Sequence, residues 1–156
     1  MILTEDIRKV IEKDYTNIKF LSWLYDLDEF NSDEQDTIFN LFRTGTTYGY
    51  FINNIMRGFI RIIYNVSLDV YSINMLFVDT SFQNCGIGSE LLQLAINKFN
   101  DKDIVLNVFT DNYIAINLYK KFGFVIEGIV DCSHEPECPL KFIYKKQYKM
   151  KRKCVT

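Results

Sequence analysis

The sequence has 156 residues, of which 48% are hydrophobic and 24% charged, and its formal net charge is -2. This length is typical of one domain, and we expect residues 1–156 to form a single domain. The 13 Phe and 10 Tyr, beside only 2 Pro, exclude a disordered chain, which would be poor in aromatic residues. The near-neutral charge gives no general attraction for nucleic acid, so we expect no such partner.

The compartment and the cysteines can be considered together. Met1–Asp14 mixes charged with apolar residues, unlike a secretion signal, and no apolar run approaches the roughly 20 residues of a membrane span. We therefore expect a cytoplasmic protein with no membrane partner and with free thiols. Cys132 and Cys138 flank His134, the only histidine. Their spacing is not that of a zinc site and no second ligand pair exists, so we expect no metal.

The first half of the chain predicts two helices and then strands. A helix is expected over residues 4–14, because apolar residues recur there at helical spacing. A second helix is expected to begin at the capping box Ser32–Gln35 and to end near Gly45. Three strands follow, at 46–52, 55–66 and 70–78, separated by the turns Asn53-Asn54 and 65–69. Such short turns favour an antiparallel meander.

After residue 80 helices and strands alternate. Helices are predicted at 87–99 and 112–122, and strands at 104–109, 124–130 and 142–150. A meander followed by a β-α-β-α-β half predicts an α/β fold, more closely an α+β fold with a mixed sheet and helices on both faces.

The segment Gln83–Gly88 joins a predicted strand to a predicted helix and contains Gly86 and Gly88. Glycines let the backbone pass close to a ligand, and the start of a helix offers unpaired N–H groups and the positive end of its dipole. The pattern favours a phosphate or pyrophosphate site; a glycine-rich turn without a ligand is the alternative. A dinucleotide-binding fingerprint is excluded, because its third small residue would be Leu91 and the next strand lacks a terminal acid.

A second segment, Asp111–Phe124, follows the next predicted strand. Asn112 is suited to cap a helix, and Gly123 to end it in the left-handed conformation. Ala115, Leu118 and Phe122 would face inward. Tyr119 falls at the edge of this stripe, where it either presents its hydroxyl to a ligand or is a boundary aromatic.

Together the two segments resemble the Gcn5-related N-acetyltransferase (GNAT) family. The matching pattern is Gln83-x-x-Gly86-x-Gly88 after one strand, then Asn112-x-x-Ala115-x-x-Leu118-Tyr119-x-x-Phe122-Gly123-Phe124 after the next. The resemblance covers residues 73–130. It implies a GNAT-like fold with splayed central strands, whose first strand would be the few residues 1–3. It also implies an acetyl-coenzyme A-dependent N-acetyltransferase that uses no metal.

The same resemblance implies roles for individual residues. The pyrophosphate would be held by the Gln83 side chain and by the backbone N–H groups of Cys85, Gly86, Ile87, Gly88 and Ser89. The main chain at Phe77 and Val78 would pair with the pantetheine arm, and an N–H near Leu76–Val78 would stabilise the oxyanion. Asn112 would contact the cofactor. Tyr119 would be the catalytic acid that protonates the departing thiolate.

The chain departs from the family pattern at the general base. Many members carry a glutamate on the strand before the loop, and Asn74 stands there instead. An amide cannot accept a proton at neutral pH. Asp79, Glu127, His134 or a water chain remain as candidates for the base.

The acceptor is expected to be a primary amine, on a small molecule or on a protein. Acidic residues gather at 26–36 and 131–137; they are either solvated surface or the mouth of a site for a cation such as a polyamine, lysine or aminosugar. A homodimer is left open. Two other function classes are also open: a catalytically weak acetyl-coenzyme A-binding sensor, and an interaction domain without a ligand.

Overall fold

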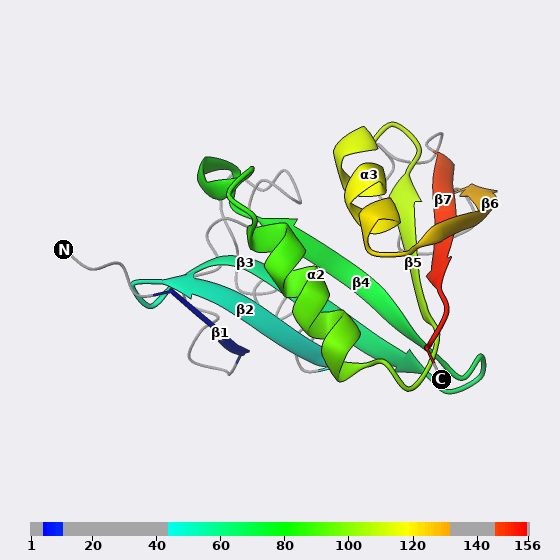
Figure 1. The fold of residues 1–156 in the computed structure, drawn as a ribbon, viewed down its shortest axis with the longest axis horizontal. Helices are drawn as coiled ribbons and strands as arrows, with labels where there is room; N and C mark the ends of the chain where they lie inside the picture. The colour runs from blue at the N-terminus through cyan, green and yellow to red at the C-terminus, as the bar shows by residue number, and fades with distance from the viewer. Residues whose placement is uncertain (1–4, 11–43, 132–145, 156) are drawn as a thin grey trace, which may run out of the picture. The chain divides into compact units, whose positions relative to one another are not determined.

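A computed structural model describes residues 5–10, 44–131 and 146–155 (Figure 1). Seven strands form one sheet in the order β1-β2-β3-β4-β5-β7-β6. The elements are β1 (Glu5–Lys9), β2 (Thr46–Ile52), β3 (Ile55–Asn65), β4 (Val70–Val78), the short 3-10 helix η2 (Thr80–Phe82), α2 (Ile87–Lys98), β5 (Ile104–Phe109), α3 (Tyr113–Lys121), β6 (Val125–Asp131) and β7 (Lys146–Arg152). The expected mixed sheet with helices between its later strands is confirmed.

The meander forms where the turn residues predicted it. β2 pairs antiparallel with β3, from Thr46↔Ile62 to Ile52↔Ile55. The connecting residues Asn53 and Asn54 have φ of 51° and 63°, the left-handed conformation that two-residue hairpin turns require and that Asn tolerates. β4 follows β3 after a turn at 66–69 and lies next to it in the sheet.

The predicted helix over residues 4–14 is wrong where the structure describes it. Residues Glu5–Lys9 form strand β1, which pairs antiparallel with β2 from Glu5↔Ile52 to Lys9↔Tyr48. Two contacts with β2 explain the difference. The Tyr50 hydroxyl donates to Glu5 at 2.9 Å, and the guanidinium of Arg8 lies 3.8 Å from the Phe51 ring centre. Pairing with a distant strand overrides the local periodicity. The first described strand is at 5–9, and residues 1–3, where the resemblance implied a strand, lie outside the described residues.

The chain divides into two compact units. The first comprises Met1–Ile63 and Met75–Ala95. There α2 lies across the strands of the meander (Figure 1). Its buried residues recur at helical spacing, namely Ile87, Leu91, Leu92, Ala95 and Ile96. This amphipathic stripe fixes the start of α2 against the sheet.

The second unit comprises Tyr64–Asn74 and Ile96–Thr156. Within it β5 pairs in parallel with the first part of β4, from Tyr71↔Ile104 to Ile73↔Leu106, and antiparallel with β7. Helix α3 begins at Asn112, whose side chain accepts from the Ala115 N–H at 3.2 Å. It ends before Gly123, which has φ of +88°. Both caps agree with the sequence prediction.

Two further expectations need a correction or fall outside the structure. The buried residues of α3 are Ile116 and Tyr119, whereas Ala115, Leu118 and Phe122 are half-buried. The stripe is therefore rotated by one residue from the predicted one. The second predicted helix, except its expected stop near Gly45, and the residues Cys132, His134 and Cys138 lie outside the described residues.

Candidate functional site

The segment between β4 and α2 begins with a capped 3-10 turn. The Asp79 carboxylate accepts a hydrogen bond from the Ser81 N–H at 3.2 Å, and the Phe82 N–H donates to the Asp79 carbonyl at 2.8 Å. Gln83 then turns back, and its side-chain amide donates to the Val78 carbonyl at 3.2 Å. The turn directs the chain away from the strand before the glycines begin.

The glycine loop, residues 83–88, combines an exposed main chain with left-handed backbone. Asn84 has φ of 61° and Gly86 has φ of +86°. Apart from its chain neighbours, a Cβ atom on Gly86 would meet no atom of the described residues within 4 Å. Glycine is required there by conformation rather than by crowding. Gln83, Asn84, Cys85 and Gly86 are all exposed, so this stretch of main chain is open to a ligand.

Helix α2 starts directly after the loop. Its first hydrogen bond runs from the Glu90 N–H to the Gly86 carbonyl at 3.0 Å. The N–H groups of Ile87, Gly88 and Ser89 come before that bond, where a helix has no internal acceptors for them. These three donors and the positive end of the helix dipole lie next to the open loop.

The last part of β4 leads into this segment. Leu76 and Val78 are half-buried and Phe77 is buried. Phe77 stacks on Phe59 of β3, with ring centres 5.7 Å apart. Among the described residues the register with β5 comprises Tyr71 to Ile73 and no later pair.

The second unit holds the other two predicted site residues, Asn112 and Tyr119. Asn112 is exposed and caps α3. Tyr119 is 8% exposed and meets the Phe124 ring edge-on at 5.8 Å between centres. Burial raises the pKa of Tyr119 from 10.0 to about 12, because an apolar environment disfavours the phenolate. Its hydroxyl therefore carries its proton throughout the physiological pH range.

The family model for the acetyltransferase (GNAT) family matches residues 4–124. The chain belongs to the GNAT family. Among solved structures, Ard1 from Thermoplasma volcanium is similar to this GNAT chain at 26% identity and a TM-score of 0.75, covering 97% of this chain and 99% of that one. The predicted GNAT-like fold is confirmed.

Two curated relatives match over shorter stretches. Spermine/spermidine N(1)-acetyltransferase of Bacillus subtilis is 33% identical over 67 residues, 40% of this chain and 44% of the relative. L-amino acid N-acetyltransferase AaaT of Escherichia coli is 42% identical over 55 residues, 33% of this chain and 34% of the relative. The matches thus span less than half the length of each of these relatives.

The GNAT fold places the candidate bases in different surroundings. Asp79 is engaged twice, by the Ser81 N–H and by an ion pair of 3.0 Å with Arg57. Glu127 on β6 forms an ion pair of 3.5 Å with Lys151. Asn74 is exposed on β4. His134 lies outside the described residues. Of these candidates, Asp79 has a carboxylate that is already engaged in two structural contacts.

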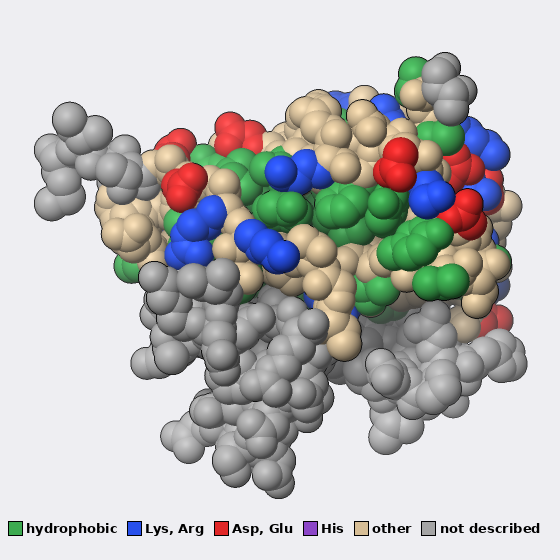
Figure 2. All heavy atoms as spheres, turned by 90° about the horizontal axis from the view of Figure 1, so that it is seen from below, with side chains coloured by type: hydrophobic (Ala, Val, Ile, Leu, Met, Phe, Trp, Pro, Cys, Tyr) green, Lys and Arg blue, Asp and Glu red, His purple; other side chains and the backbone are tan. Residues whose placement is uncertain are grey.

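Charge and membrane features of the described part of this GNAT chain are unremarkable. Acidic and basic side chains are interspersed in small groups on the face drawn in Figure 2. Neither of the described helices has the length and apolar composition to cross a membrane. Within residues 5–10, 44–131 and 146–155, no three His, Cys, Asp or Glu side chains gather as a metal site would require.

Sequence reasoning missed two residues that the structure places beside the site segments. Arg57 of β3 contacts both Asp79 and Phe82, and Gly58 lies against the main chain of Phe77. Neither belongs to the recognised motifs. The signal in the sequence is limited to a glycine and two arginines, Arg57 and Arg61, inside a mostly apolar strand.

Proposed function

We propose that this protein transfers the acetyl group of acetyl-coenzyme A to a primary amine. The observation that carries the proposal is the open loop at Gly86, with φ of +86°, followed by the N–H groups at the start of α2, for which the helix itself has no acceptors. A curved main chain with several N–H groups beside a helix N-terminus fits a pyrophosphate. The residues present therefore fit the cofactor that the family implies.

The loop residues would each have a defined task. The N–H groups of Cys85, Gly86, Ile87, Gly88 and Ser89 would donate to the pyrophosphate oxygens. The Gln83 amide, which donates to the Val78 carbonyl, adds a side-chain contact when it turns to the cofactor. Residues 83–89 contain no lysine or arginine, so the pyrophosphate would be held by the main chain and the helix dipole rather than by a basic side chain of the loop.

The main chain of β4 would bind the remainder of the cofactor. The register with β5 ends at Ile73, and we assign the groups of Phe77 and Val78 to the pantetheine arm, as an added strand. An N–H from Leu76–Val78 directed at the carbonyl oxygen would stabilise the negative charge that develops there, an effect of about 3–4 kcal/mol.

Acetyl-coenzyme A supplies a thioester, whose C–S bond breaks as the C–N bond of the amide forms. We assign Tyr119 as the acid that protonates the departing thiolate and Asn112 as a cofactor contact. Because the pKa of Tyr119 is raised to about 12, its hydroxyl stays protonated but gives up its proton less readily than an ordinary tyrosine. A hydrogen bond from the hydroxyl to the thiolate would therefore be a large part of its effect. The amine loses its proton to a base, for which we favour water next to Asn74.

The acceptor class is proposed from two observations. The relatives include a spermine/spermidine acetyltransferase and an L-amino acid acetyltransferase, and both act on amines. The acidic residues at 131–137, of which Asp131 is exposed on β6, would attract a cation. A polyamine is therefore the first acceptor to test, and an amino acid the second.

The test is a steady-state assay of thiol release with acetyl-coenzyme A and a panel of spermidine, spermine, amino acids, lysine peptides and aminosugars. Mass spectrometry of the product checks for a gain of one acetyl group. We expect turnover with at least one cationic amine. Tight acetyl-coenzyme A binding without turnover on any amine would favour the alternative, a cofactor-binding sensor, which the replacement of the usual glutamate by Asn74 supports.

A further inference from the structure

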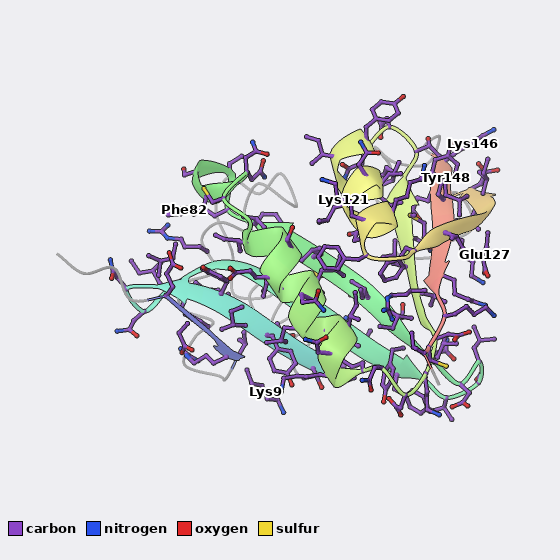
Figure 3. All side chains as sticks on the ribbon, in the orientation of Figure 1. Lys9, Phe82, Lys121, Glu127, Lys146 and Tyr148 are labelled. Carbon is purple, nitrogen blue, oxygen red and sulfur yellow. The ribbon has the colours of Figure 1, made fainter. Side chains whose placement is uncertain are left out.

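The segment that leads from β4 into the glycine loop is held by a side chain from another strand. We call residues 79–82 the connector. Arg57 of β3 donates from Nη1 to Oδ2 of Asp79 at 3.0 Å, at the start of the connector. Its guanidinium carbon also lies 4.4 Å from the centre of the Phe82 ring, at the end of the connector, where Figure 3 labels Phe82. One side chain therefore contacts both ends.

The main chain supports the same arrangement. The Asp79 N–H donates to the Arg57 carbonyl at 2.7 Å, so the two residues are joined by backbone and by side chain. The side chains of Arg57 and Asp79 are 28% and 15% exposed. Partial removal from water makes such an ion pair stronger than one on an open surface.

In this placement of the guanidinium, one hydrogen-bond donor of Arg57 is left unsatisfied. Nε of Arg57 is buried and has no hydrogen-bond partner among the described residues. A buried donor without a partner is destabilising. Natural proteins tolerate such unpaired buried donors mostly at functional sites. The orientation therefore favours contact with the connector over full pairing of Arg57.

The glycine loop has little other support. Residues 83–86 are exposed, and, apart from its chain neighbours, no described residue has an atom within 4 Å of where a Gly86 Cβ would be. Among the described residues, packing fixes the loop only at its ends, beside the hydrogen bond from the Gln83 side chain to the Val78 carbonyl. Ile87 is 3% exposed and anchors the start of α2, and the connector anchors the other end. The position of the loop N–H groups then depends on how firmly the connector is held.

We infer that Arg57 is a positioning residue for cofactor binding. Through Asp79 and Phe82 it holds the connector so that the loop N–H groups converge on one pyrophosphate. The inference rests on the proposed function, since it takes the loop as the pyrophosphate site. In this role Arg57 would act through the connector rather than by touching the cofactor.

The test compares Arg57→Met and Arg57→Lys with the wild type. Methionine keeps the aliphatic stem but removes the charge and the planar group; lysine keeps the charge alone. For Arg57→Met we expect the Kd for acetyl-coenzyme A, by titration calorimetry, to rise about threefold to thirtyfold, from loss of an ion pair and a cation–π contact. The Kd of Arg57→Lys should lie between those of the wild type and Arg57→Met. In the protein without cofactor, hydrogen exchange of residues 79–89 should quicken in Arg57→Met.

Lys102→Met is the matched control. Lys102 also forms an ion pair, with Asp69 at 2.8 Å, and its side chain is also 28% exposed. Its ammonium lies 5.7 Å from the centre of the Tyr64 ring. The same two kinds of contact are lost, but in the unit that does not hold the loop. We expect the Kd and the exchange of residues 79–89 to stay at wild-type values.

The outcomes separate this inference from the proposed function. If the wild type does not bind acetyl-coenzyme A, the proposed function fails and the inference fails with it. If the wild type binds and folded Arg57→Met binds equally well, only the inference fails. Should Arg57→Met not fold, Phe82→Leu takes its place, since it removes the ring and leaves the ion pair. A rise in Kd of about twofold to fivefold is then expected, and an unchanged Kd overturns the inference.

Discussion

Gly58 of β3 lies so close to Phe77 of β4 that a Cβ atom on Gly58 would be 2.8 Å from the Phe77 carbonyl oxygen. The same atom would be 3.0 Å from the Ile87 side chain at the start of α2. Cβ atoms essentially never come that near another heavy atom, so only glycine fits unless the main chain moves. A residue outside the recognised motifs thus sets the position of the β4 main chain that we assign to the pantetheine arm.

Gly58→Ala should weaken cofactor binding. The added methyl group must displace the Phe77 carbonyl or the start of α2, and both belong to the proposed cofactor site. We expect the Kd for acetyl-coenzyme A to rise at least fivefold, and the free energy of unfolding to fall by about 1–3 kcal/mol from overpacking. Titration calorimetry and urea unfolding measure the two effects. Gly128→Ala is the control, because a Cβ on Gly128 would meet no other part of the described chain within 4 Å.

Gly88→Glu tests the loop itself. It places a negative charge among the N–H groups at the start of α2, where the pyrophosphate is proposed to sit. We expect acetyl-coenzyme A binding to be lost while the circular dichroism spectrum stays that of the wild type. Gln93→Glu, which adds the same charge at an exposed position later in α2, should bind normally. Unchanged affinity in folded Gly88→Glu would remove the loop from the site.

An element of the fold can be predicted from the sequence when the contacts that stabilise it are local. Asn53, Asn54 and Gly123 reveal their turns because their left-handed backbone is a property of each residue. Glu5–Lys9 does not reveal its strand, because its partners Tyr50 and Phe51 lie far along the chain.

The same distinction holds for the candidate site. Gln83–Gly88 is recognisable because glycine spacing and a following helix are local features. Arg57 is not, since its partner Asp79 is 22 residues away and an ion pair between two strands leaves no pattern in the sequence. The sequence also does not predict the burial of Tyr119, because the apolar stripe of α3 is rotated by one residue from the predicted one.

Tyr119→Phe tests the proposed acid. The ring and its contact with Phe124 are retained and only the hydroxyl is removed. If Tyr119 protonates the thiolate, kcat should fall about 10-fold to 1000-fold with little change in the Kd for acetyl-coenzyme A. Tyr113→Phe is the control on the same helix, where the side chain is 71% exposed. Equal kcat for wild type and Tyr119→Phe, with chemistry rate-limiting, would return Tyr119 to a packing role.

The raised pKa of Tyr119 also predicts a pH dependence of stability. Its pKa is about 12 in the folded protein against the ordinary tyrosine value of 10.0, so the unfolded chain loses the proton first as the pH rises. The stabilisation is complete below pH 10 and is lost between pH 10 and 12, by up to about 2–3 kcal/mol. Urea unfolding from pH 9 to 12 should show a smaller loss in Tyr119→Phe than in the wild type. Parallel losses in the two proteins would contradict the burial of the hydroxyl.

Cys85 gives a chemical test of where the cofactor lies. The thiol is exposed within the glycine loop, and its Sγ lies 3.6 Å from the Gln83 carbonyl oxygen. Cys154 near the end of the chain is half-buried and has no part in the proposed site, so it serves as an internal reference.

Iodoacetamide should label Cys85 faster than Cys154 in the free protein. Saturating acetyl-coenzyme A should slow the labelling of Cys85, because the pyrophosphate covers the loop and adds negative charge beside the sulfur. The rate at Cys154 should not change. Peptide mass analysis at several time points gives both rates from one sample, and equal Cys85 rates with and without cofactor would show that the cofactor does not cover this loop.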